Sequence, residues 1–62
     1  MIKEHDLVIL KSKIGNIFSN SVGTVVYVHF YTPFNKEYEV EFVGEDTSTV
    51  LHLCEYQIQK FK

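Results

Sequence analysis

Histidine and cysteine side chains offer the most chemistry in this 62-residue chain, which has three histidines and one cysteine. His5, His29 and His52 could bind a metal ion together with carboxylates, because imidazole nitrogen and carboxylate oxygen are both ligands of Zn²⁺. Their positions fit no metal-binding motif, and a histidine outside such a motif is more often an ordinary surface residue. The sequence therefore predicts neither a metal site nor a cofactor.

Cys54 could act as a nucleophile, because His52 lies two residues before it and both side chains would project from the same face of a strand. A catalytic pair also needs a third group that orients the histidine and a site that binds an oxyanion. No pattern in the sequence provides these groups. We therefore predict no catalytic residues and no enzymatic activity, and we interpret Cys54 as a half-buried packing residue.

The elements that would position these side chains are predicted to be strands. Valine, isoleucine, phenylalanine and tyrosine dominate the apolar residues, and the chain contains no alanine. The segments with strand patterns are Leu7–Leu10, Val22–Tyr31, Glu37–Val43, Thr49–Cys54 and Ile58–Phe61. They are joined by a long first loop (11–20), a turn (32–36), a hairpin loop (44–48) and a single 3₁₀ turn (55–57).

Strands in this order predict an all-β fold, a small five-stranded SH3-like barrel that forms one domain over residues 1–62. Closing the barrel would remove most of the exposed strand edges. Gly23, near the start of the longest strand, predicts a bulge or a tight bend there. The apolar residues of the first loop are expected to pack onto the barrel mouth; they are Ile14, Ile17 and Phe18.

The third strand has the clearest alternation of apolar and charged residues. The side chains expected to face the core are Tyr38, Val40 and Phe42. Those expected to face water are Glu37, Glu39 and Glu41. In the fourth strand Thr49, Leu51 and Leu53 share one face.

Acidic and aromatic residues are the candidate partner-binding residues. The acidic stripe comprises Glu37, Glu39, Glu41, Glu45 and Asp46. It would suit a basic protein, although charged outer faces of strands are also normal on a protein with no partner. The aromatic candidates are Tyr27, Tyr31 and Phe34, accompanied by Phe30 and Tyr56. Exposed aromatics often line the peptide groove of SH3-like barrels, and packing at the barrel ends is the alternative.

The charge of the chain bears on its partners and its location. A formal net charge of −2 disfavours nucleic acid, because such binding depends largely on neutralising phosphates. The N-terminal segment is too polar for a signal peptide and no apolar run is long enough to span a membrane, so we expect a cytoplasmic protein without a membrane partner. A homodimer stays open, because Val43, Val50 and Phe61 could pair two copies.

Several segments resemble a family of small bacterial proteins, largely cyanobacterial, that is described only as a domain of unknown function. The resemblance covers almost the whole chain, and the segments that carry it are Ile2–Val8, Val22–Val28, Tyr38–Phe42 and Gln57–Ile58. The second and third of these are also similar to the SH3-like domain of the nitrile hydratase β subunit and to KOW-type modules. Two positions depart from the family pattern: Asn20-Ser21 replaces Gly-Asp, and Gln59-Lys60 replaces Arg-Pro.

The resemblance implies a function in binding rather than in catalysis. Members of the family are often encoded beside a second small protein of toxin-like or unknown type. An antitoxin-like or immunity-like protein that binds a basic, toxin-like partner encoded nearby is therefore what the resemblance implies. The alternatives are a KOW-like nucleic-acid-binding module and an accessory subunit of an enzyme complex, the latter by analogy of fold alone.

Overall fold

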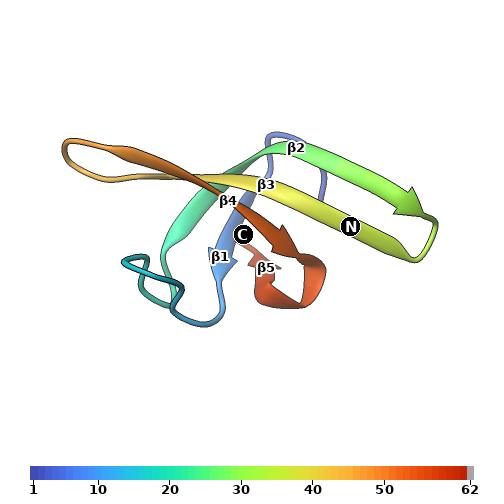
Figure 1. Ribbon diagram of the computed structural model, residues 1–62, viewed down its shortest axis with the longest axis horizontal. Coiled ribbons are helices and arrows are strands. Elements are labelled where there is room, and N and C mark those ends of the chain that lie inside the picture. The colour runs from blue at the N-terminus through green and yellow to red at the C-terminus, as the bar shows by residue number, and fades with distance from the viewer. Residues whose placement is uncertain (62) are drawn as a thin grey trace.

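Five strands and one 3₁₀ turn build the protein in the computed structural model, which describes residues 1–61 (Figure 1). The strands are β1 (Leu7–Leu10), β2 (Val22–Thr32), β3 (Asn35–Val43), β4 (Ser48–Cys54) and β5 (Ile58–Lys60). The turn η1 (Glu55–Gln57) separates β4 from β5. No helix among the described residues has the length and apolar character needed to cross a membrane. The predicted all-β class, with a 3₁₀ turn before the last of five strands, is confirmed.

All five strands belong to one antiparallel sheet, in the order β4-β3-β2-β1-β5. β2 is long enough to serve two neighbours, so that Thr24 pairs with Leu7 of β1 and with Glu41 of β3. Within residues 1–61 the two outermost strands, β4 and β5, do not pair, so hydrogen bonds do not close the sheet. The expected loss of strand edges is thus incomplete, because the chain leaves β4 through η1 before β5 begins.

Alternate strand residues supply the core. The buried apolar side chains are Ile2, Val8, Leu10, Val25, Tyr38, Val40, Phe42, Leu53 and Ile58. The inward set predicted for β3 is confirmed, and Leu51 of β4 packs against it. Each fully buried valine or leucine stabilises the fold by about 1.5–3 kcal/mol relative to an exposed one. Burial also raises the pKa of the Tyr38 phenol above its usual value, because the core disfavours the charged form.

Two register shifts interrupt the pairing of β2 with β3, one between Val25 and Tyr27 and the other between Phe30 and Thr32. An extra residue of this kind bends a strand and increases its twist. Of the two alternatives predicted for Gly23, a bulge or a tight bend, the bulge is absent, because this glycine keeps regular pairing with β1. The first shift also reverses the alternation of β2: Val25 faces the core, whereas Tyr27, two residues later, faces outward.

Gly23 instead allows β2 to lie close over the side chains of β3. A Cβ atom at this position would lie 2.6 Å from Cγ1 of Val40 and 2.8 Å from Cε1 of Phe42. Those distances are shorter than van der Waals contact, so the absence of a side chain is what admits the two core residues. The glycine is therefore required by packing rather than by a bulge.

The connection between β1 and β2 forms a small hairpin of its own. Ile14 and Ile17 exchange two backbone hydrogen bonds of 2.9 Å around a turn in which Gly15 has a φ of +56°. Their side chains pack against the core, as expected. Phe18 does not join them: it is 66% exposed, and the Lys13 ammonium lies 5.2 Å from the centre of its ring.

The turn between β2 and β3 is shorter than the predicted turn over residues 32–36. Thr32 pairs with Asn35, so that Pro33 and Phe34 alone form the tip. The backbone N–H of Phe34 donates a hydrogen bond of 3.2 Å to the Thr32 hydroxyl, which favours the tight turn. Every other strand boundary lies within one residue of its predicted position.

Replacing Gly23 with alanine is expected to destabilise the protein by about 1–3 kcal/mol, the usual effect of adding a methyl group to a packed core. Gly44→Ala is the matched control, because its Cβ would lie 3.4 Å from the nearest atom, the Thr47 carbonyl oxygen. Urea unfolding followed by circular dichroism measures both variants. Equal stability of the two variants would show that β2 does not approach β3 in this way.

Candidate functional site

Three neighbouring strands present a polar and aromatic surface on the side of the sheet away from the core. The outward residues are Tyr27, His29 and Tyr31 of β2, Glu37, Glu39 and Glu41 of β3, and Val50, His52 and Cys54 of β4. Strand pairing places these three rows next to one another. We use the term outer patch for six of these residues: Tyr27, His29, Tyr31, Glu37, Glu39 and His52.

Two hydrogen bonds connect the histidines of the outer patch to its carboxylates. Nε2 of His29 lies 2.6 Å from Oε2 of Glu39, and Nε2 of His52 lies 2.5 Å from Oε1 of Glu37. Both bonds are diagonal, because the register sets His29 opposite Glu37 and His52 opposite Glu39. Each carboxylate therefore has one histidine directly across from it and the other one diagonally placed, both within reach of cross-strand contact.

Aromatic rings surround His29 on the outer patch. Its ring centroid lies 4.9 Å from that of His52, with 21° between the planes, and 5.9 Å from that of Tyr31, with 5° between the planes. Tyr27 presents an edge-to-face contact at 4.7 Å. Such contacts are the favoured geometries of aromatic pairs. They restrict the orientation of the His29 ring, whose side chain stays 25% exposed.

The electrostatics of the outer patch depend on the two histidines. The side chains of His29 and Glu39 are 25% and 37% exposed, and those of His52 and Glu37 are 47% and 27% exposed. The chain contains no arginine, and no lysine among the described residues forms an ion pair with either glutamate. When both histidines are neutral, the outer patch therefore carries two negative charges.

The predicted acidic stripe is divided in the structure. Glu37 and Glu39 point outward as expected, but they are partly buried rather than fully in water, because the cross-strand histidines lie against them. Glu41 follows on the same face of β3, while Glu45 and Asp46 are exposed in the loop between β3 and β4. Within residues 1–61 these last three carboxylates form no ion pair.

The predicted aromatic candidates are all exposed, but they do not converge on one surface. Tyr27 and Tyr31, which are 53% and 55% exposed, belong to the outer patch. Phe34 is 98% exposed at the tip of the β2–β3 turn, at the far end of the molecule from the β3–β4 loop (Figure 1). Phe30 and Tyr56 are also exposed. The structure thus groups only part of the predicted set.

His29 and His52 are the site residues that reasoning from the sequence treated as unrelated surface residues. Alternation alone, counted from the buried Val25, would send His29 toward the core. The register shift before Tyr27 turns it outward. The signal available in the sequence was the pair of glutamates on β3, which an outward histidine of either neighbouring strand would meet.

Cys54 does not form the nucleophile pair that its spacing from His52 allowed. Nε2 of His52 is hydrogen-bonded to Glu37 rather than to the Cys54 thiol. The thiol is partly buried, and the Cys54 backbone N–H donates to Oε1 of Gln57 at 2.7 Å. The role that the structure assigns to this residue is to begin η1.

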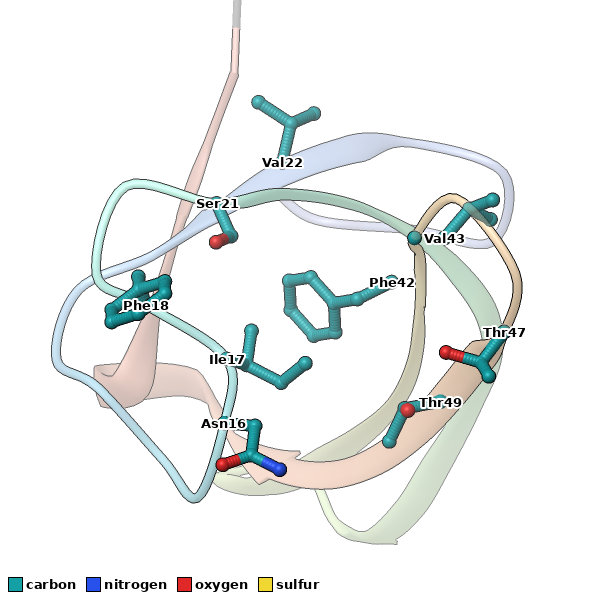
Figure 2. A pocket seen from close by; sticks show the side chains of 10 residues that line it. Asn16, Ile17, Phe18, Ser21, Val22, Phe42, Val43, Thr47 and Thr49 are labelled. Carbon is teal, nitrogen blue, oxygen red and sulfur yellow. The ribbon is translucent and has the colours of Figure 1, made fainter.

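A pocket of about 470 Å³ opens between the β1–β2 connection and the β3–β4 loop. Figure 2 shows the Phe42 ring pointing into this space beside Ile17. The other lining residues are Asn16, Phe18, Ser21, Val22, Val43, Gly44, Thr47 and Thr49. None of them carries a carboxylate, imidazole, thiol or ammonium group, so the pocket lacks the usual side chains of general acid–base catalysis.

Comparisons of this chain with protein-family models, with curated proteins and with solved structures find no match. The five-stranded antiparallel sheet is therefore established by the strand pairing in the structure and not by similarity to a known protein. The family resemblance of the sequence segments contributes to a proposal of function only.

Removing His29 and Glu39 together is expected to destabilise the protein by less than the sum of the two single effects. The difference, about 0.2–1 kcal/mol for a pair near the surface, is the energy of their interaction. Urea unfolding of His29→Ala, Glu39→Ala and the double variant gives this energy. The control cycle combines His29→Ala with Glu41→Ala, which has no bond to His29; an equal energy in both cycles would contradict the geometry of the outer patch.

Proposed function

We propose that this protein is a non-catalytic protein-binding module that binds its partner through the outer patch. The observation that carries the proposal is the exposed pair Tyr27 and Tyr31, which flank His29 on the face of the three longest strands. Tyrosine is enriched at protein interfaces, because it combines apolar area with a hydroxyl group that can hydrogen-bond. A fixed aromatic surface of this kind needs little ordering when a partner binds.

The distribution of exposed apolar side chains supports this proposal. Within residues 1–61, twelve large hydrophobic side chains are exposed, whereas nine form the core. Six of the twelve lie on the β2–β3 hairpin, namely Val22, Tyr27, Phe30, Tyr31, Phe34 and Val43. Exposed hydrophobic residues that occur singly need no explanation, but Tyr27 and Tyr31 lie on one face, on either side of His29, and so form a joint surface.

The charge next to the outer patch favours a basic partner. Glu41 continues the outward row of β3, and the β3–β4 loop adds Glu45 and Asp46. None of the three is neutralised by an ion pair within the described residues. Lysine or arginine side chains of a partner would meet this acidic end, and complementary charge speeds the encounter of two proteins.

The family resemblance suggests the class of partner. A toxin-like protein encoded nearby would be such a basic partner, and the present chain would then serve as its antitoxin-like or immunity-like protein. One departure from the family pattern is compatible with the fold. Asn20 has a φ of 70°, a left-handed conformation that glycine adopts freely and asparagine tolerates.

Nucleic acid suits the outer patch less well than protein does. Modules that stack bases on aromatic side chains place them in a positively charged groove. Here the tyrosines stand beside Glu37 and Glu39, and the chain has no arginine. The KOW-like alternative is therefore disfavoured by charge, and a role as an accessory subunit of an enzyme rests on analogy alone.

Co-expression with the protein encoded beside it is expected to yield a stable complex that survives purification. Tyr27→Ala and Tyr31→Ala should each weaken the complex by about 10-fold or more, since buried tyrosines are frequent hot spots of interfaces. Tyr56→Ala is the matched control, because Tyr56 is 75% exposed in η1, outside the outer patch. Isothermal titration calorimetry on variants with native circular dichroism spectra measures the affinities.

Two results would contradict the proposal. Failure of the two proteins to form a complex would remove the binding function proposed with this partner. A complex weakened by Tyr56→Ala but not by the substitutions at Tyr27 and Tyr31 would place the interface elsewhere.

A further inference from the structure

We propose that His29, His52 and Glu39 bind a divalent transition-metal ion of the Zn²⁺ type, with Glu37 positioned as a fourth ligand. This inference does not depend on the proposed protein partner. It rests on the side-chain atoms that strand pairing collects on the outer patch. One imidazole nitrogen from each histidine and a carboxylate oxygen of Glu39 all lie within 4.8 Å of one another.

The distances between these atoms are close to those of a metal site. Ligand atoms around a tetrahedral Zn²⁺ lie about 3.3 Å apart, because the Zn–N and Zn–O bonds are about 2.0–2.2 Å long. Nε2 of His29 and Oε2 of Glu39 are already 2.6 Å apart, so this pair needs to separate slightly, and no pair of ligand atoms exceeds 4.8 Å. Small rotations of the partly exposed Glu39 and His52 side chains would bring the atoms to ligand distances while the His29 ring keeps its place.

Glu37 is placed to complete the site. Its Oε1 atom lies 2.5 Å from Nε2 of His52, and its backbone pairs with His29. It is therefore adjacent to both histidines. Two imidazoles and two carboxylates would give four protein ligands, and a water molecule can replace Glu37 because the face is open to solvent.

The supporting elements limit the movement of the ligands. The three ligands come from the adjacent strands β2, β3 and β4, whose opposite faces form the core. Tyr27 and Tyr31 pack against the His29 ring. The ring is therefore already held in one orientation, and metal binding costs it little conformational entropy. Ligands on paired strands are held more precisely than ligands on loops.

The charge of the outer patch favours a dication. Glu37 and Glu39 carry two negative charges that no lysine neutralises within residues 1–61, and the chain contains no arginine. Two neutral imidazoles with these two carboxylates would balance a divalent ion. The nitrogen donors select a transition metal over Ca²⁺ and Mg²⁺, which prefer six or more oxygen ligands.

Titration of the EDTA-treated protein with ZnCl₂ in a calorimeter tests the proposal. One ion is expected to bind per chain. His29→Ala, His52→Ala and Glu39→Gln should each weaken binding by more than about 10-fold, since even loss of residues that only support a ligand has that effect. His5→Ala and Cys54→Ser are matched controls and should leave the affinity unchanged, because neither belongs to the ligand set.

Cobalt provides a second readout that does not rely on stability of a variant. Co²⁺ bound by the wild-type chain should show the visible absorption of a site with nitrogen and oxygen ligands and no thiolate charge-transfer band. A thiolate band, or loss of Zn²⁺ affinity in Cys54→Ser, would show that Cys54 is a ligand and would overturn the proposed set of histidine and glutamate ligands. Absence of Zn²⁺ binding by the wild-type chain, or one ion for every two chains, would overturn it as well.

Discussion

The pairing register of β2, β3 and β4 is the constraint on which the rest of the molecule depends. Side chains of a strand alternate between two faces, so a slip of one residue would exchange the core with the surface. The present register directs Tyr38, Val40 and Phe42 into the core. It also aligns His29, Glu39 and His52 across three strands on the opposite face. Core and outer patch are therefore two consequences of one pairing.

The outer patch contributes little to the stability that holds it in place. Partly exposed ion pairs typically contribute about 0–1 kcal/mol, whereas each large buried side chain of the core contributes more. The two histidine–glutamate bonds can therefore exchange for other interactions without loss of the fold. A partner protein or a metal ion would act on the same side chains, so binding of one is expected to influence binding of the other.

Much of the fold could be predicted because its signals are local. The alternation from Tyr38 to Phe42 predicted β3 and its inward face, and the polar break at residues 55–57 predicted the 3₁₀ turn. The partners of Glu37 and Glu39 could not be found in this way. Identifying them requires the cross-strand register, and the register shift between Val25 and Tyr27 reverses the direction of the side chains that follow it, His29 among them.

The same limit explains Gly23 and the loop residues. A glycine in a strand is compatible with a bulge or with close approach of another chain segment, and only the positions of Val40 and Phe42 show that the second applies. Phe18 carries the same apolar signal as Ile14 and Ile17, yet it lies outside the core, because the small hairpin fixes which of its residues face inward.

Nuclear Overhauser contacts between the ring protons of His29 and His52 test the central claim most directly. These residues are far apart in the sequence, and their ring centroids are 4.9 Å apart only if both β2 and β4 pair with β3 in the register described. The account predicts cross-peaks between the two imidazole rings, together with contacts from His29 to Tyr27. Absence of contacts between the rings, with either histidine contacting core residues instead, would contradict the register and the outer patch that follows from it.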